Sequence, residues 1–309
     1  MKLKRAFYLL MISFILSVST QAAIFQELSE PKEALVSGLG HIRGFSKQAS
    51  SVFDAPAATS YLNGFSFSSS YREGLFDDTL SMNTAFSINV NQAVLSLGIA
   101  EQRADGIPLT LGQTPFDGAD VSTFSFSRRA YVSSVGLPLN DRLRLGLSVT
   151  GYTVSLHNFY GWGATSQLHA LIYMGGPSVS LKFDNILSKP VVYSTGSTES
   201  FTKRSSVAFS IPLKETIHFP LTFLHEYITE ENSFTHRTAG LITWDWDDDS
   251  GIKAAVGMRK TGDVSTWSSA LDLTIWPLQL GVSYEPTTVL TKDAQWFFSI
   301  GFQLERKDK

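Results

Sequence analysis

Residues 79–100 read TLSMNTAFSINVNQAVLSLGIA, and this stretch decides the fold class of the chain. Before the polar segment at residues 89–92, an apolar or β-branched residue at every second position alternates with a small or polar one. The alternation resumes at Ala93 and continues to the end of the stretch. A period of two is the signature of a β-strand with one apolar and one polar face. The stretch is therefore predicted to be a hairpin whose strands, each about ten residues long, are sufficient to cross a bilayer when tilted.

A hairpin of this kind also occurs in soluble β-sandwiches, so one copy does not separate the two classes. The same pattern recurs from residue 63 to residue 304 in about fourteen segments. Most segments carry Ser, Gly or another small polar residue opposite the apolar face, which predicts a wet interior and a lipid-facing exterior. A soluble sandwich would turn its apolar faces inward and would have to protect its sheet edges. The sequence therefore predicts an all-β fold, a transmembrane antiparallel β-barrel of about 14 strands over residues 63–309.

Residues 1–22 have the features of a secretory signal peptide. Three basic residues precede an apolar core over residues 6–18, and small residues stand before a cleavage site at Ala23. The apolar core is too short for a membrane span. We expect this segment to be removed on export, which places the mature barrel in the cell outer membrane.

Residues 23–62 lack the strand pattern. Residues 46–61 are rich in Ala and Ser, and residues 27–39 are expected to hold a short helix. A barrel of about 14 strands has a lumen too wide for the side chains of its own wall to fill. Because residues 23–62 form a non-strand segment long enough to fill it, they are predicted to be an N-terminal plug. A flexible periplasmic leader is the alternative.

The predicted connections differ in length between the two ends of the barrel. Those at one end are short, whereas the longest ones, residues 102–121 and 185–201, fall at the other end together with residues 157–164. Short periplasmic turns and longer outer loops are typical of outer-membrane barrels. An even number of strands then places both chain ends in the periplasm.

Charged residues on the small polar face are the candidates for lining the lumen. An Arg on the lipid face at mid-membrane would cost about 2–4 kcal/mol, so the alternation directs such residues inward. The lumen-lining and ligand-contact candidates are Arg144, Lys182, Glu226, Lys253, Arg259 and Asp272. A solvated inner wall without a selective role is the alternative interpretation.

The composition argues against several classes of function. The chain has no cysteine, which excludes disulfide and thiolate chemistry. Its net charge of −3 argues against a nucleic-acid partner. It has no glycine-rich nucleotide-binding loop, and metal-ligand spacing is absent among His157, His169, His218, His225 and His236. We therefore expect no cofactor, no metal site and no enzyme activity.

Residues 50–64, SSVFDAPAATSYLNG, stand directly before the first predicted strand. They resemble the N-terminal region of the FadL-type outer-membrane barrels and of their PorV-like and PorQ-like relatives. In that superfamily a Gly- and Ala-rich stretch with an acidic residue leads into an Asn-Pro-Ala-Gly-like sequence. Asp54 and Asn63 match the acidic residue and the Asn, which makes them plug candidates. Gly64 follows Asn63 directly, without the Pro-Ala, and this departure leaves the branch of the superfamily open.

Two further segments carry the resemblance. Residues 182–187, KFDNIL, are similar to the strand-ending Asn-Leu segment of these barrels. Residues 296–304 resemble the closing strand that the barrel assembly machinery recognises, although a charged tail over residues 305–309 follows here. The resemblance implies a wall of about 14 strands in the outer membrane.

The resemblance also implies a choice of roles. The FadL branch passively transports hydrophobic small molecules across the outer membrane, the PorV branch is a scaffold for secreted protein cargo, and a general porin is a third alternative. For a transporter, the long loops would supply an apolar ligand pocket from Leu109, Leu111, Phe116, Val191 and Val192. The expected partners are outer-membrane lipid, a hydrophobic ligand or a secreted protein, and the barrel assembly machinery during biogenesis.

Overall fold

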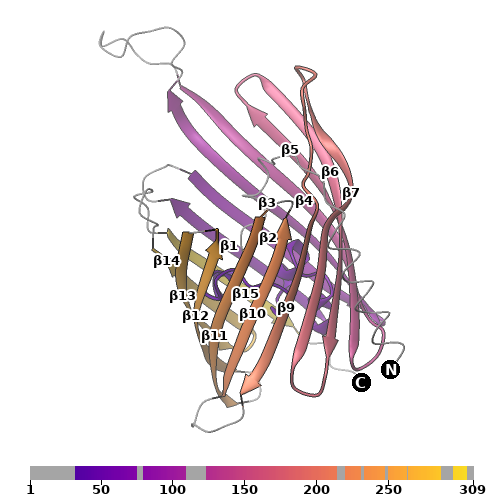
Figure 1. Ribbon diagram of the computed structural model, residues 1–309, viewed down its shortest axis with the longest axis vertical. Helices are drawn as coiled ribbons and strands as arrows, with labels where there is room; N and C mark the ends of the chain where they lie inside the picture. The colour runs from indigo at the N-terminus through magenta and orange to yellow at the C-terminus, as the bar shows by residue number, and fades with distance from the viewer. Residues whose placement is uncertain are drawn as a thin grey trace.

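The computed structural model describes the following parts of the chain: residues 32–74, 79–108, 123–213, 220–230, 233–247, 250–262, 264–286 and 295–304. These residues form fifteen β-strands, one short α-helix and two 3-10 helices (Figure 1). The signal peptide predicted over residues 1–22 and the start of the predicted plug, residues 23–31, lie outside the described residues. None of the described helices is long and apolar enough to cross a membrane.

The strands follow one another along the chain, as the alternation predicts. In order they are β1 (Phe65–Gly74), β2 (Thr79–Val90), β3 (Ala93–Pro108), β4 (Thr123–Pro138), β5 (Leu143–Leu156), β6 (Phe159–Tyr173), β7 (Ser178–Tyr193), β8 (Thr198–Glu199), β9 (Arg204–Leu213), β10 (Leu221–Glu230), β11 (Ser233–Asp247), β12 (Ser250–Thr261), β13 (Val264–Ile275), β14 (Leu278–Glu285) and β15 (Gln295–Leu304).

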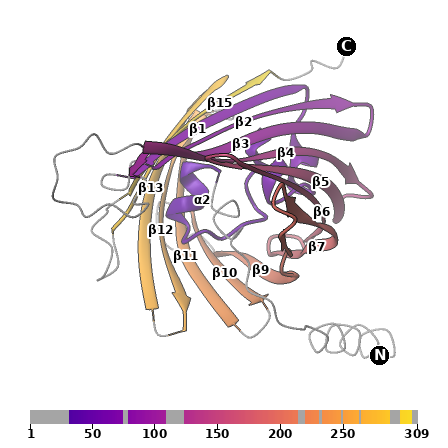
Figure 2. The ribbon, with the colours of Figure 1, turned by 90° about the horizontal axis from the view of Figure 1, so that it is seen from above.

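The strands close into one barrel (Figure 2). Successive wall strands pair antiparallel, β7 pairs with β6 and β9, and β1 pairs with β15 from Phe65 opposite Leu304 onward. The two-residue strand β8 joins the edge of β7. The other fourteen strands form the wall, so the prediction of a closed antiparallel barrel of about 14 strands is confirmed. Closure gives backbone polar groups partners within the wall, which lipid requires.

The apolar residues of the strands face outward and the small polar ones face inward. Leu97 on β3 is 63% exposed, whereas its neighbour Ser96 is 2% exposed. Ser87 on β2 lies opposite Ser96 and donates a hydrogen bond to it across the lumen-facing side, 2.8 Å between the hydroxyl oxygens. This polarity is the reverse of a soluble sandwich and is that of an outer-membrane-type barrel.

Aromatic residues gather at both ends of the wall. Trp267, Tyr284 and Trp296 form a row across β13, β14 and β15, with ring centroids 6.3 and 4.9 Å apart. Trp276 stands at the opposite end of β13, and Trp244 near that end of β11. Two aromatic belts of this kind are typical of the two membrane–water interfaces.

Several strands are longer than the sequence pattern predicts, and they rise on one side of the barrel (Figure 1). β6 begins at Phe159, inside the connection expected at residues 157–164, and β3 runs to Pro108, inside the loop expected at residues 102–121. β7 continues to Tyr193, so Val191 and Val192 belong to a strand and not to a loop. Beyond the lipid both faces of a strand meet water, so the apolar alternation that marks a strand fades there. Leu109, Leu111 and Phe116 lie outside the described residues.

Residues 32–62 lie inside the barrel and are called the plug below (Figure 2). The plug contains α2 (Ala34–Gly38) and the 3-10 helices η2 (Ala49–Phe53) and η3 (Ala58–Tyr61). Leu35, Leu39 and Ile42 pack against small wall residues and one leucine, which are Ala208, Leu224, Ala239, Ala255 and Ala270. Small side chains on the inner wall thus leave room for the plug, as the predicted fold class requires.

Two wall glycines admit the plug backbone directly. A Cβ built on Gly146 would lie 2.1 Å from the backbone nitrogen of Ala57, and one built on Gly257 would lie 2.1 Å from that of Gly40. Any side chain at either position would displace the plug, so glycine is a packing requirement there.

Candidate functional site

A cavity of about 600 Å³ lies between the plug and the wall. Its size falls in the range of small-molecule sites. Much of its lining is apolar, with side chains from the plug and from β6, β10 and β11: Leu35, Val36, Leu39, Ile42, Phe45, Leu171, Leu224 and Leu241. Charged groups also line it, namely Glu33, Lys47, Asp141 and Lys253. The cavity therefore offers both apolar and charged surface to a small molecule.

Glu33 is a buried acid of the plug. Its side chain is 2% exposed, and it accepts hydrogen bonds from the hydroxyls of Ser46 and Ser50, the latter at 3.3 Å. Burial raises the pKa of Glu33 from about 4.5 to about 8, against the opposing effect of the Ser46 hydroxyl. The carboxyl group is therefore mostly neutral at pH 7.

Buried ion pairs surround the middle of the plug. Arg43 and Asp54 of the plug lie 3.9 Å apart. On the wall, the Asp184 carboxylate lies 2.7 Å from Arg204 and 3.5 Å from Lys182. Charges in such a setting are tolerated because each has an opposite partner.

A second group of charges holds the end of α2. Arg237 on β11 lies 2.9 Å from the Glu226 carboxylate and donates to the backbone carbonyl of His41 at 2.5 Å. The His41 ring lies between Glu285, 2.8 Å from Nε2, and Arg259, 3.1 Å from Nδ1. Burial lowers the pKa of His41 to about 4, so its imidazole is neutral at pH 7.

The six predicted lumen residues all lie on the inner face of the wall. Arg144 donates to the carbonyl of Ser60 at 2.8 Å and its guanidinium lies 3.8 Å from the ring centroid of Tyr61. Lys253 lines the cavity, and Asp272 accepts a hydrogen bond from Gln279 at 2.6 Å. The ion pairs above contain the other three, Lys182, Glu226 and Arg259. Their contact with a ligand stays a prediction.

The two plug candidates differ. Asp54 is buried next to Arg43, whereas Asn63 is exposed where the plug meets β1. Several residues of the charged groups were not among the sequence candidates: His41, Arg43, Asp184, Arg204, Arg237 and Glu285. The alternation could have found Arg237 and Glu285, which stand at inner-face positions of β11 and β14, but it carries no signal for plug residues.

The wall is interrupted between β7 and β9. Their pairing ends with Asp184 opposite Arg204, although β7 continues to Tyr193. On this side residues 185–190 of β7, called the open edge below, pair with no strand among the described residues, and β8 joins only at Val191 and Val192. β7 thus extends beyond its pairing with β9 along the open edge before β8 joins it.

A bulge in β7 begins at the same place. Gln167 of β6 faces Asp184 whereas Thr165 faces Ser188, so three residues of β7 stand opposite one of β6. Asn185 adopts a positive φ of 60°, which Asn tolerates better than most residues. Its side-chain amide donates to the carbonyl of Thr202 at 2.6 Å. Bulges bend a strand and redirect its side chains.

An apolar cluster adjoins the open edge. Val191 directly follows that edge, and it packs with Val154 and with Phe201 from the β8–β9 link. Partly buried aromatic residues complete the cluster: Phe126, Tyr152 and Tyr193. The rings of Tyr152 and Phe201 lie 5.0 Å apart between centroids. Apolar side chains therefore back the interrupted part of the wall.

Solved structures with the same architecture cover nearly the whole chain. The toluene transporter TodX of Pseudomonas putida matches 90% of this chain and 100% of its own, with a TM-score of 0.65 and 8% identity. The toluene transporter TbuX of Ralstonia pickettii matches 91% of this chain and 99% of its own, with a TM-score of 0.61 and 10% identity.

A FadL homologue of Pseudomonas aeruginosa matches 87% of this chain and 97% of its own, with a TM-score of 0.53 and 9% identity. The chain has the fold of the FadL-type barrels. No protein-family model matches the sequence, and a search of curated proteins also gave no match. The PorV-like branch of the resemblance stays a sequence-based prediction.

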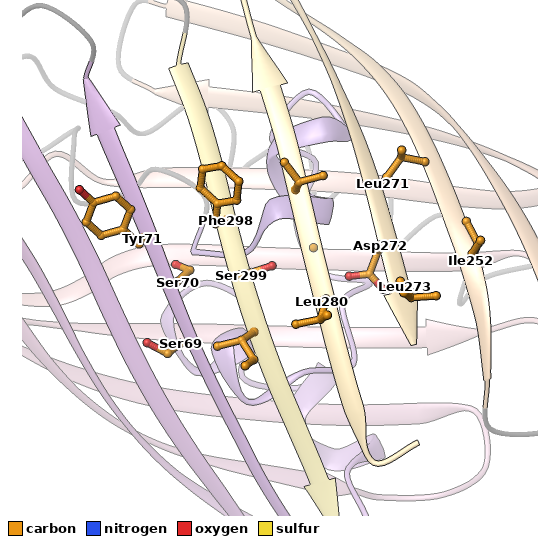
Figure 3. A pocket seen from close by; sticks show the side chains of 13 residues that line it. Ser69, Ser70, Tyr71, Ile252, Leu271, Asp272, Leu273, Leu280, Phe298 and Ser299 are labelled. Carbon is orange, nitrogen blue, oxygen red and sulfur yellow. The ribbon is translucent and has the colours of Figure 1, made fainter. Parts of the chain in front are cut away.

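The outer surface of the barrel carries an apolar groove of about 610 Å³ over β12–β15 and β1. Leu271, Leu280 and Phe298 line it from outside, and Figure 3 shows Asp272 and Ser299 pointing toward one another on either side of β14. The Asp272 oxygen Oδ2 is buried and has no hydrogen-bond partner among the described residues. The groove lies on the outward face of the wall, and most of its lining is apolar.

The lumen contains a close Ser–His contact that cannot act as a nucleophile and base. His169 Nε2 lies 2.8 Å from the Ser180 hydroxyl oxygen, and Nδ1 accepts from the backbone N–H of Ala57 at 3.1 Å. Since Nδ1 accepts, the neutral ring carries its proton on Nε2 and cannot take another from Ser180 there. Among the described residues, no three His, Cys, Asp or Glu side chains are placed to hold a metal ion.

Proposed function

We propose that this chain passively transports a hydrophobic small molecule across the outer membrane. The observation that carries the proposal is the open edge of β7 beside the apolar cluster of Val154, Val191 and Phe201. An interrupted wall lined by apolar side chains gives such a molecule a path between the lumen and the lipid.

The anchoring of the plug favours a route through the wall. Arg144 and Arg237 each donate to a plug carbonyl, and Ser268 donates to the carbonyl of Ser37 at 2.7 Å. Expelling the plug would break these hydrogen bonds together with the buried ion pairs.

The names of the structural neighbours agree in the class of cargo. TodX and TbuX are described as toluene transporters, and CymD, a further neighbour with a TM-score of 0.59, as a monoaromatic hydrocarbon channel. We infer an uncharged or largely apolar small molecule for this chain as well. The apolar part of the lumen cavity is consistent with such a molecule.

The experiment places a charge in the path. Phe201→Asp puts a carboxylate in the apolar cluster, and Lys203→Asp puts one at an exposed position of the same link. Uptake of radiolabelled toluene is measured in cells that carry each variant and lack other toluene channels. We expect F201D to lose most uptake and K203D to keep it. Equal uptake by F201D and wild type, with heat-modifiable gel mobility showing folded barrels, overturns the proposal.

The two alternatives give other outcomes. A general porin requires an open lumen and would pass small ions readily, whereas here residues 32–62 lie in the lumen. A scaffold for secreted protein would lose function when its outer loops are exchanged, with small-molecule uptake unchanged. A transporter predicts the reverse, so loop exchange combined with uptake separates them.

A further inference from the structure

Two buried histidines connect the plug to the wall from opposite sides. His41 belongs to the plug, and its Nδ1 lies 3.1 Å from Nη1 of Arg259 on β12. His169 belongs to β6, and its Nδ1 lies 3.1 Å from the backbone nitrogen of Ala57 in the plug. Their exposed fractions are 3% and 0%. Each ring thus takes part in a hydrogen bond that crosses the plug–wall boundary.

The partners determine the protonation of both rings. A guanidinium and a backbone N–H can only donate, so Nδ1 of each histidine must be an unprotonated acceptor. The other nitrogen, Nε2, then carries the proton and lies 2.8 Å from Glu285 in His41 and 2.8 Å from Ser180 in His169. Both histidines are therefore neutral in the docked arrangement, with the same tautomer.

We propose that binding of a proton to His41 and to His169 releases the plug from the wall, which makes the plug an acid-sensitive closure of the barrel. A proton added at Nδ1 turns the acceptor into a donor that faces another donor. The hydrogen bond across the boundary is lost, and two buried polar hydrogens are left opposed. This inference concerns the closure alone and does not depend on which molecule the barrel transports.

The charges near each ring decide how far a protonated imidazole is stabilised or destabilised there. Two ion pairs flank His41, Arg259 with Glu285 and Arg237 with Glu226, so each carboxylate already has a cation and a positive imidazole adds a charge without a partner of its own. Near His169 lie Lys182 and Asp184, one charge of each sign, and the ring also makes a hydrogen bond to the backbone of Ala55 in the plug.

The direction of the pH effect follows from the pKa of His41. Burial lowers this pKa from about 6.5, the value expected once the plug is released, to about 4 in the docked state. The docked state thus binds fewer protons, and docking weakens as the pH falls through this window. Each histidine that behaves in this way lowers the docking equilibrium constant about tenfold per pH unit.

The experiment measures opening of the full-length barrel in a planar bilayer as the pH is lowered from about 7 to about 5, where most carboxylates remain ionised. The slope of the logarithm of the open-to-closed ratio against pH counts the protons. Glu33 in the docked plug holds a proton that it releases when exposed, and this opposite contribution is common to all variants. Relative to the wild type, we therefore expect the slope to fall by about one unit for His41→Asn or His169→Asn and by about two units for the double variant. Asn keeps an acceptor oxygen near the Nδ1 position and tolerates the positive φ of 67° at residue 41.

His157→Asn is the matched control, because His157 lies exposed in the β5–β6 turn. It should keep the wild-type slope. A slope that H41N and H169N leave unchanged, or a wild-type barrel that does not open in this pH range, overturns the proposal. If H169N does not fold, H41N alone decides, since its slope must fall by about one unit relative to the wild type.

Discussion

The guanidinium of Arg204 lies 2.7 Å from the carboxylate of Asp184, at the last position where β7 and β9 pair. The two residues face each other in the register, so the ion pair closes the wall directly below the open edge. Both side chains are largely buried, with 12% and 13% exposed. The pair therefore marks where the closed wall ends and the interrupted wall begins.

Replacing Arg204 by Met should destabilise the barrel strongly. Asp184 would keep Lys182 at 3.5 Å but lose its shorter partner, and removing one member of a buried pair costs about 3–5 kcal/mol. The change is measured as the free energy of unfolding in urea, followed by tryptophan fluorescence.

Arg129→Met is the control for this variant. Arg129 pairs with Glu101 at 2.9 Å on the outer face, with 46% of its side chain exposed. An exposed pair contributes about 1 kcal/mol or less. Equal losses in the two variants would show that the Asp184 pair does not hold the wall together.

A single methyl group at Gly257 should push the plug away from the wall. The Cβ of Gly257→Ala would lie 2.1 Å from the backbone nitrogen of Gly40, and a backbone cannot move aside as a flexible side chain can. Overpacking of this kind costs about 1–3 kcal/mol. We expect more frequent opening in planar-bilayer recordings, whereas Gly151→Ala, which meets nothing within 4 Å, should stay closed.

Arg144 should hold the C-terminal end of the plug against the wall. Arg144→Met loses two hydrogen bonds to Ser60 and the contact with the Tyr61 ring. Together they contribute about 2 kcal/mol, so cleavage of the plug by added protease should become faster. Arg142 lies exposed in the preceding turn, and Arg142→Met should leave the cleavage rate unchanged. An equal increase in the cleavage rate for R142M would show that the loss of positive charge, and not the loss of the contacts with Ser60 and Tyr61, is the cause.

The alternation of small polar and apolar residues predicts which way a strand residue points, but not what it meets. It placed Lys182, Glu226 and Asp272 on the inner face correctly. It could not pair His41 with Glu285, because the two residues are 244 positions apart and the plug has no periodic pattern. Contacts between the plug and the wall depend on three-dimensional packing alone.

The open edge escaped prediction for a related reason. Ser188, Lys189 and Pro190 in β7 have neither apolar alternation nor good strand propensity, so residues 185–201 were expected to be a loop. The strand persists because β6 pairs with it beyond the bulge, as in Thr165 opposite Ser188. Tertiary pairing thus outweighs local preference there, at the position that the transport proposal uses.

Glu33 gives the plug a dependence on pH at the alkaline side of neutrality. Its pKa in the folded protein is about 8, above the value of about 4.5 that it has when exposed, so the folded state holds a proton that the unfolded state releases. Stability is therefore full below about pH 4.5 and is lost as the pH rises toward about 8, on the order of 1 kcal/mol per pH unit. Glu33→Gln keeps acceptors for Ser46 and Ser50 but cannot ionise. The measurement is the free energy of unfolding in urea between pH 5 and pH 8, and the value for E33Q should rise relative to that of the wild type as the pH rises. Glu101→Gln, on the outer face, should show the same pH dependence as the wild type. Parallel curves for E33Q and wild type would mean that Glu33 is ionised throughout.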